Sequence, residues 1–359
     1  MPLRLKCQNK IFLMSKSIFQ EGGPHNIRRT GQDEYSMRIS IPPDEDGYLA
    51  RECPESGCSP GYFKVKPGTG ITDGQEQAFC PYCHNCADPS EFTTKEQIRY
   101  AEDIALQEAH KGVGRMIKDA FGLGASGKRS YGGGFLSMDI EYKPKHPPHV
   151  RPPFEEEVRR DVVCPHCGLD HSVFGLAMWC PDCGEDIFMS HVKTEYAVVR
   201  KMLSDIQRRK DELGNRVAAR DIENALEDIV SIFEAVLRVL LRRLLTEKGI
   251  SNEEIEEIFK KRVRNKFQNV KRAQQLLKDK FNVDLFSNPK PEDIDFLNNV
   301  FEKRHPITHN LGVVDKRYLE NARTAEKEGR DIRVTAEEIE KAIGISIHIL
   351  EDFHSRLFV

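Results

Sequence analysis

Two pairs of cysteines in the middle of the sequence have a spacing suited to metal binding. The pairs are CPHC (Cys164–Cys167) and CPDC (Cys180–Cys183), and twelve residues separate them. Each pair places two thiols on one tight turn, and the glycine after each pair, Gly168 or Gly184, suits that turn. A set of free buried cysteines is the simpler interpretation, but the paired spacing favours a zinc ribbon. Such a site is closed by four sulfur ligands and stabilises the fold without catalysing a reaction.

A less regular group of cysteines precedes this ribbon. CPESGC contains Cys53 and Cys58, and CPYCHNC contains Cys80, Cys83 and Cys86. We predict that Cys53, Cys58, Cys80 and Cys83 bind a second zinc ion, because Cys80 and Cys83 have the regular two-residue spacing. Cys86 is the alternative to Cys83. The sequence therefore predicts two structural zinc ions per chain.

A polar cluster near the end of the sequence, FEKRHPITHN (Phe301–Asn310), could carry different chemistry. Arg304 keeps its charge and can bind two phosphate oxygens at once, whereas His309 titrates near neutral pH and can transfer protons. On an unbroken helix these two side chains would lie about 140° apart. We expect Pro306 to end or bend the helix near Arg304 and so to bring both residues to one side. The alternative is that a second subunit supplies the missing partner.

A simpler interpretation of the same cluster needs no catalysis. Arg304 would stabilise the carboxyl end of a helix through its charge, and His309 and Asn310 would cap the next turn. A basic run that precedes the cluster, Lys260–Gln275, is open in the same way. It is either a solvated helix face or a surface that follows a phosphate backbone.

The surrounding sequence predicts an α+β multidomain protein, with small β-rich zinc modules followed by an all-α helical bundle. Glu34–Pro42 is typical of a strand, and Gly122–Gly134 is rich enough in glycine to predict a flexible loop. The expected domains are a strand-containing domain with the irregular zinc site and a helix, a proline-rich connector, the four-cysteine ribbon and the helical bundle. Their ranges are 1–142, 143–156, 157–192 and 193–359.

Local signals support the helical second half. Three pairs have the spacing of a capping box, in which a Ser or Thr and a Glu three residues later close the first turn of a helix. An apolar stripe along a predicted long helix that ends at Gly249 would bury one face. The capping pairs are Thr93 with Glu96, Ser251 with Glu254 and Thr335 with Glu338, and the stripe is Ile222, Leu226, Ile229, Phe233, Val236 and Leu240.

Composition sets outer limits on function. The chain has 359 residues, 39% of them hydrophobic and 31% charged, and a formal net charge of -3. No apolar run is long enough to span a membrane, and the start of the chain does not resemble a secretion signal, so we expect a cytoplasmic protein with reduced cysteines. Cys7 has no evident partner and is interpreted as a small buried apolar residue.

The R-x4-H motif formed by Arg304 and His309, placed in a C-terminal helical bundle and followed by Asn310, Gly312 and Asp315, resembles the HEPN superfamily. Many members are metal-independent endoribonucleases of toxin, anti-phage defence or RNA-surveillance systems, and they commonly form homodimers in which two motifs line one cleft. The resemblance covers the second half of the chain.

The resemblance implies a role for each residue of the motif. Arg304 would stabilise the transition-state phosphate, and His309 would act as the general acid or base. His305 and Asn310 would position an RNA substrate, which the 2′-hydroxyl would cleave to a 2′,3′-cyclic phosphate. The zinc modules would recognise a trigger, a nucleic acid or a partner.

Two other functions fit the same sequence. In the first, the zinc ribbons bind nucleic acid or serve as a scaffold, and the helical bundle only dimerises. In the second, the HEPN-like domain is inactive and pairs with an antitoxin or an activating partner. Loss of RNA cleavage on replacing Arg304 or His309 would distinguish these functions from the endoribonuclease.

Overall fold

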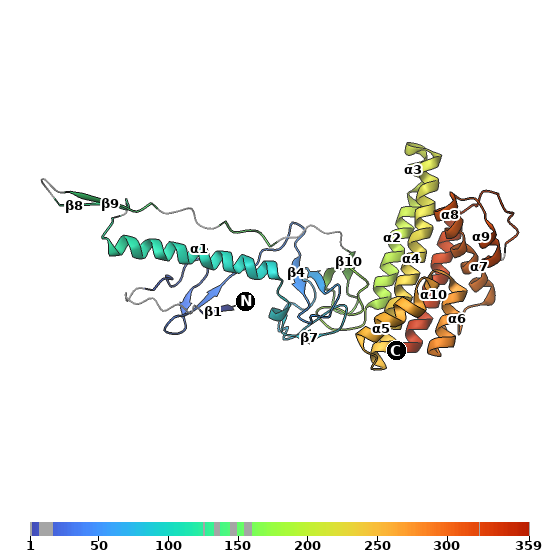
Figure 1. Ribbon diagram of the computed structural model, residues 1–359, viewed down its shortest axis with the longest axis horizontal. Helices are drawn as coiled ribbons and strands as arrows, with labels where there is room; N and C mark the ends of the chain where they lie inside the picture. Colours follow the sequence, from blue (N-terminus) through green and yellow to red (C-terminus); the bar gives the residue numbers. More distant parts are fainter. Residues whose placement is uncertain are drawn as a thin grey trace. The chain divides into compact units, whose positions relative to one another are not determined.

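The computed structural model describes residues 2–6, 17–124, 126–132, 137–143, 149–153, 160–322 and 324–358 (Figure 1). The chain forms two compact units. The N-terminal unit comprises Met1–Phe174 and Cys180–Gly184, and the helical unit comprises Gly175–Trp179 and Glu185–Val359. Cys7 and most of the expected proline-rich connector lie outside the described residues.

Small sheets and a single long helix make up the N-terminal unit. In chain order the elements are β1 (Pro2–Lys6), β2 (Arg28–Arg29), β3 (Glu34–Arg38), β4 (Leu49–Glu52), β5 (Tyr62–Val65), β6 (Ala78–Phe79), β7 (Cys86–Ala87), the 3-10 turn η1 (Pro89–Phe92), α1 (Lys95–Ala120), β8 (Lys128–Tyr131), β9 (Met138–Glu141), β10 (Arg160–Val163) and β11 (Asp170–Val173). All strand pairs are antiparallel. The strand predicted at Glu34–Pro42 is confirmed in part, as β3, which ends at Arg38.

The first sheet has the order β1-β3-β2 and packs against α1, which lies along it in Figure 1. Met37 and Ile39 bury their side chains against Ile104 and its neighbours on the helix. The chain passes so close to α1 that a Cβ atom on Gly112 would lie 1.6 Å from the carbonyl oxygen of Ile18. Glycine is therefore required at this point in the helix interior, despite its low helix propensity.

The second sheet joins strands from the two cysteine modules. Its order is β10-β11-β5-β4, so β11 of the later module pairs directly with β5 of the earlier one. Phe63 and Val173, which are opposite each other in the register, are both buried. The two cysteine modules therefore share one sheet and one core.

Two local predictions for the N-terminal unit need correction. The capping box of α1 is formed by Thr94 and Gln97 and not by Thr93 and Glu96. The Thr93 hydroxyl instead donates to the carbonyl of Ser90 at 2.7 Å and completes the preceding 3-10 turn, which moves the helix start by one residue.

The second correction concerns the glycine-rich segment Gly122–Gly134. It contains a strand, β8, which pairs with β9. An ion pair of 3.0 Å between Lys128 and Glu141 and stacking of Arg129 on the Tyr131 ring accompany this pairing. Gly127 and Gly132 flank β8 with positive φ of 70° and 92°, while the side chains between them favour an extended strand.

Helices make up the helical unit. They are α2 (Phe188–Ser204), α3 (Ile206–Leu213), α4 (Asn215–Glu247), α5 (Asn252–Ile258), the π-helical turn η2 (Phe259–Val263), the 3-10 turn η3 (Lys266–Gln268), α6 (Val270–Phe281), α7 (Pro291–Glu302), α8 (Arg304–Asn310), α9 (Lys316–Asn321) and α10 (Ala336–Phe358). The capping boxes at Ser251 and Thr335 are confirmed. No helix among the described residues is long and apolar enough to cross a membrane.

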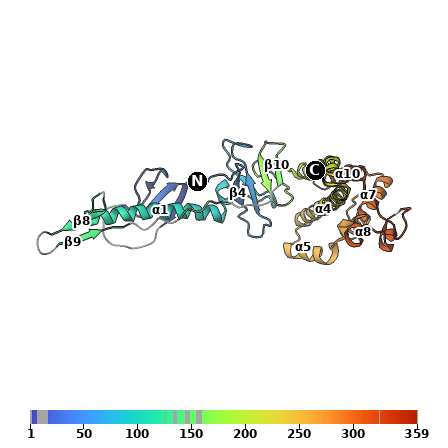
Figure 2. The ribbon, with the colours of Figure 1, turned by 90° about the horizontal axis from the view of Figure 1, so that it is seen from above.

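The core of the helical unit surrounds α4, which Figure 2 shows beside α10. The predicted stripe is confirmed, because Leu226, Ile229, Phe233, Val236 and Leu240 are each fully buried. The helix ends at Glu247, and Gly249 follows it with a positive φ of 76°, as the sequence predicted for the end of a helix.

A charged cluster anchors the start of the helical unit to α4 and α10. The Arg243 guanidinium binds Asp186 at 2.6 Å and stacks on the rings of Trp179 and Phe358. His354 lies 3.3 Å from the same carboxylate. Because the Arg243 side chain is 11% exposed, its charge depends on this carboxylate for compensation.

We predict that replacing Asp186 by asparagine lowers the free energy of unfolding by about 1–3 kcal/mol, because it leaves Arg243 buried without a full counter-charge. Urea unfolding followed by the fluorescence of Trp179, the one tryptophan in the chain, measures the change. Glu247→Gln is the matched control, since Glu247 contacts the same guanidinium at 3.1 Å but is 51% exposed. Equal losses in both variants would contradict the prediction.

The lowered pKa of Asp186 leads us to predict that stability depends on pH. Burial acts to raise the pKa of Asp186, but hydrogen bonds from His354, Arg243 and the Phe188 N–H outweigh it and hold the pKa at about 2. A lowered folded-state pKa stabilises the fold fully above the ordinary value of 3.8, and this stabilisation is lost as the pH falls toward 2. In Asp186→Asn this part of the acid dependence should be absent.

Candidate functional site

The first group of four cysteines lies in the N-terminal unit, beside the ends of short strands. Cys53 follows β4, and Cys80 and Cys83 occupy the turn between β6 and β7. The Sγ atoms of Cys53 and Cys83 are 3.6 Å apart, as are those of Cys58 and Cys80. All four sulfur atoms lie within 4.8 Å of one another. Cys86 is exposed on β7 and is not part of the group.

The second group has the same form. Cys164 and Cys167 lie on the turn between β10 and β11, and Cys180 and Cys183 lie on a second turn of the same kind. The Cys164 and Cys183 sulfurs are 3.8 Å apart, and those of Cys167 and Cys180 are 3.6 Å apart. The two groups could therefore hold two metal ions.

The sulfur geometry fits a tetrahedral ion. A zinc ion about 2.3 Å from each of four sulfurs at tetrahedral angles places the sulfurs about 3.8 Å apart. The closest pairs in both groups are 3.6–3.8 Å apart, which is far longer than the bond of about 2.05 Å in a disulfide. The nine described cysteines are free.

Burial opposes the ionisation of two of the sulfurs. It raises the pKa of Cys53 and of Cys180, so these thiols resist ionisation when no positive charge is near. A divalent metal ion reverses this preference, because it stabilises the thiolates that bind it. Four sulfur ligands fill such an ion's coordination sphere, which suits a structural site.

The three Cys-x-x-Cys turns share one backbone conformation. In each turn the N–H of the residue after the second cysteine donates to the carbonyl of the first cysteine, and that residue has a positive φ. Gly168 and Gly184 hold this position in two turns, with φ of 78° and 71°. In the third turn it is His84, with φ of 60°, where a side chain costs about 1–2 kcal/mol.

His84 links the two cysteine groups. Its Nε2 atom lies 3.0 Å from the carbonyl oxygen of Gly184, to which it donates when that nitrogen carries the proton. Its ring stacks on Phe79 at a centroid distance of 5.3 Å. The Phe79 N–H in turn donates to the carbonyl of Pro181 at 2.8 Å. These contacts offset the backbone strain and fix one cysteine turn against another.

Asp182 provides a second link between the groups. It lies between the cysteines of CPDC and is nearly buried, and it accepts hydrogen bonds of 3.0 Å from the Ile71 N–H and the Gln75 side chain. Both donors belong to the loop between β5 and β6. The two cysteine groups are thus joined by a shared sheet and by side chains that reach from one to the other.

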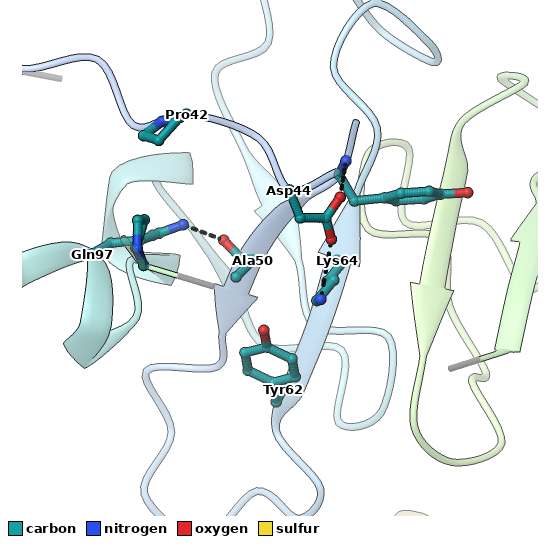
Figure 3. A pocket seen from close by; sticks show the side chains of 8 residues that line it. Pro42, Asp44, Ala50, Tyr62, Lys64 and Gln97 are labelled. Carbon is teal, nitrogen blue, oxygen red and sulfur yellow. Dashed lines mark hydrogen bonds and ion pairs between the residues drawn. The ribbon is translucent and has the colours of Figure 1, made fainter. Parts of the chain in front are cut away.

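A hollow in the described part of the N-terminal unit is too small for a ligand. Figure 3 shows the hollow lined by Asp44, Tyr62, Lys64 and Gln97, where the Lys64 ammonium turns onto Asp44 at 3.1 Å. Gln97 donates to the carbonyl of Ala50 at 2.9 Å. The space amounts to about 10 Å³, which is room for about one water molecule.

In the helical unit, the Arg304–His309 motif occupies the short helix α8. Pro306 has no N–H to donate to the carbonyl of Glu302, and its ring crowds that carbonyl, so α7 ends at Glu302. Lys303 forms the break, and its buried ammonium binds Glu338 at 2.8 Å and the Arg333 carbonyl at 2.7 Å. We expected the helix to end near Arg304. The break falls one residue before Arg304, so Arg304 and His309 share a single helix.

The position of the break decides which side chains meet. Five residues on one helix leave Arg304 and His309 about 140° apart, so Pro306 does not bring them to one side. Arg304 is half-buried and donates to the Gln268 side chain at 3.1 Å. His309 is exposed.

His305 is the nearer neighbour of His309. The two are four residues apart on α8, and their ring centroids are 5.0 Å apart. The Nε2 atom of His305 lies 3.5 Å from an Asp315 carboxylate oxygen. Burial, followed by the positive charge of Arg317, lowers the pKa of His305, which favours a neutral ring at neutral pH.

The remaining polar residues of the motif have local partners. The Asn310 amide donates to the Val313 carbonyl at 2.8 Å, within the turn that follows α8. The Thr308 hydroxyl donates to Glu227 of α4 at 2.7 Å. These bonds fix α8 on the bundle and leave His309 facing solvent.

Comparison of the chain with models of protein families, with curated proteins and with solved structures finds no match. The case for function therefore rests on the residues and their geometry. Sequence reasoning overlooked the roles of His84, Asp182 and Gln268. The sequence could have indicated the special position of His84, because it follows Cys83 as Gly168 and Gly184 follow their cysteines. The other two contacts join segments distant in sequence.

We predict that the purified protein contains two zinc ions per chain, measured by elemental analysis. Replacing Cys80 and Cys83 by serine should remove one ion, and replacing Cys180 and Cys183 should remove the other. Cys86→Ser is the matched control and should leave the zinc content unchanged, since Cys86 lies outside both groups. A content of one ion in the unchanged protein would disprove one site.

The turn conformation yields a further prediction. Gly184→Ala should destabilise the fold more than Gly168→Ala. Both substitutions add a side chain at a positive φ, which costs about 1–2 kcal/mol. At Gly184 the added Cβ also lies 3.0 Å from the Phe79 ring, whereas at Gly168 it meets nothing within 4 Å. Overpacking should add about 1–3 kcal/mol. Equal shifts in denaturation midpoint would refute the contact.

Proposed function

We propose that the helical unit is a metal-independent endoribonuclease of the HEPN type that acts as a homodimer. His309 is the general acid or base, and Arg304 binds the phosphate as negative charge develops on it. The single observation that carries the proposal is the placement of an exposed histidine and a half-buried arginine on one short helix of a helical bundle. His305 and Asn310 position the substrate. The products carry 2′,3′-cyclic phosphate and 5′-hydroxyl ends.

The geometry of α8 supports the proposed homodimer. Because Arg304 and His309 lie about 140° apart on their own helix, one copy does not present both to the same phosphate. A second copy of the chain supplies the complementary residue, so that two motifs complete one cleft. Neutral histidine accepts a proton from the 2′-hydroxyl, and arginine stabilises the charge with its fork of donors.

The cysteine groups complete the proposal. Both bind structural Zn²⁺ and hold a recognition surface for a trigger, an RNA or a protein partner. The likeness of the motif to toxin and anti-phage nucleases favours a role in prokaryotic defence or stress. A non-catalytic nucleic-acid-binding protein with the same bundle is the competing function, and the following experiment separates the two.

We predict that the zinc-loaded protein cleaves total RNA with EDTA present to remove free divalent ions. His309→Ala should reduce the rate about 10²–10⁴-fold through loss of proton transfer. Arg304→Ala should reduce it about 10²–10³-fold through loss of charge stabilisation. His348→Ala, at an exposed histidine of α10, is the matched control and should retain full activity. Intact RNA with the unchanged protein would favour the non-catalytic function.

Mixing the two inactive variants tests the composite cleft. In a mixed dimer of Arg304→Ala and His309→Ala, one chain retains the histidine and the other retains the arginine. We predict that mixing, with exchange of subunits, restores activity to at least about tenfold above either variant alone. If the mixture stays as inactive as its components, each site lies within one chain and the dimeric mechanism is wrong.

A further inference from the structure

A group of cations on the helical unit has no role in the proposed cleavage step. Lys260, Arg262, Arg264 and Lys266, here called the basic ridge, are all exposed. Among the described residues, none of the four forms an ion pair, whereas their neighbour Lys261 pairs with Glu257. No acidic residue occurs between Phe259 and Lys278. This local charge stands out in a chain whose net charge is -3.

The backbone under the ridge has an unusual conformation. A π-helical turn, η2, carries Lys260 and Arg262, and Arg264 follows with φ of 49° and ψ of -123°. That conformation is strained for any residue with a side chain. Val263, between Arg262 and Arg264, and Phe267, directly after Lys266, are fully buried and hold the segment on the core. The Arg264 carbonyl accepts a hydrogen bond from Arg238 of α4.

The ridge leads to α8. Beyond Lys266, Gln268 accepts the hydrogen bond from Arg304, and Asn269 donates to Glu302 at the end of α7. Contacts with α4 show how far the ridge lies from α8. Arg242 stacks on Phe259 at one end of the path, and Glu227 binds Thr308 of α8 at the other. The separation of fifteen positions between Glu227 and Arg242 corresponds to about 22 Å along α4.

We propose that the basic ridge binds the phosphate backbone of a single-stranded RNA that extends from α8. This inference rests on the proposed function and assigns a substrate-binding surface to it. A row of cations without ion pairs is the electrostatic requirement for a polyanion. No large apolar side chain is exposed between Ile258 and Val270, so the ridge lacks the apolar contacts that membrane insertion or an apolar protein interface requires.

Binding of an uncleavable RNA tests the ridge without depending on catalysis. The probe is a fully 2′-O-methylated oligoribonucleotide of about 12 nucleotides, whose blocked 2′ position prevents self-cleavage. Affinity is measured for the full chain over a series of salt concentrations. Lys260→Glu/Arg262→Glu/Lys266→Glu is compared with Lys201→Glu/Lys210→Glu/Arg216→Glu. The control changes the same number and types of residue, also exposed and without ion pairs among the described residues.

The ridge variant should lower the slope of log affinity against log salt by about 2, because each phosphate contact on a single strand contributes about 0.7. At about 0.1 M salt this corresponds to about a 100-fold loss of affinity. The control variant should lose less than about threefold. Equal losses in both variants, no loss in the ridge variant, or tighter binding of duplex DNA of the same length would overturn the proposal.

Arg264→Gly provides a second variant that does not depend on charge reversal. Glycine accepts the observed φ without strain, so the fold should keep its thermal stability while one cation is lost. We expect about a fivefold loss of affinity for the probe at about 0.1 M salt. A loss of stability with unchanged affinity would assign Arg264 a structural role and remove it from the ridge.

The same measurements separate this inference from the proposed nuclease. If RNA binds through the ridge but the chain cleaves nothing, the ridge stands and the nuclease fails. If the chain cleaves RNA and the ridge variant binds the probe normally, the nuclease stands and the ridge fails.

Discussion

Four sulfur atoms held 3.6–3.8 Å from their nearest neighbours cannot all ionise unless a cation lies among them, and the N-terminal unit contains two such groups. Short strands such as β6 and β7, of two residues each, bury too little apolar surface to fold by themselves. A metal ion bound by the four thiolates of each group would supply the missing free energy. The links from His84 and Asp182, and the sheet that joins β5 to β11, depend on those turns being held in place.

The sequence predicts those parts of the molecule that depend on local chemistry. The spacing of the cysteines indicates both groups, and the apolar stripe on α4 indicates the buried face, because each is set by residues a few positions apart. The pairing of β5 with β11 depends on contacts between distant segments, so the sequence does not reveal it. Helix α1 begins one residue later than predicted, because Thr94 and not the adjacent Thr93 forms its cap. The sequence predicted that Pro306 would interrupt the helix. Helix α7 ends at Glu302, four residues before Pro306, because the N–H that proline lacks would have bonded to the Glu302 carbonyl.

Backbone strain marks places of interest in both units. Among the described residues, those other than glycine and asparagine with a positive φ are His84, Arg264 and Leu311. His84 links two cysteine turns, and Arg264 belongs to the basic ridge. Leu311 follows α8 and is 87% exposed. Such conformations cost free energy and persist where the surrounding structure holds them. Glycine could not replace the side chains of His84 and Arg264 in these roles. The His84 ring bonds from one cysteine group to the other, and Arg264 carries a charge.

The path of the chain between the two units limits how the protein can be divided. The chain leaves the N-terminal unit after Phe174, returns to it for Cys180–Gly184 and then leaves again. A protease cut after Phe174 would leave the second cysteine group with half of its ligands. A cut after Gly184 would take Trp179 away from Arg243 and the Ala177 N–H away from His191. Neither unit is therefore one continuous stretch of chain, and a single cleavage that separates them takes ligands or contacts away from one of the two.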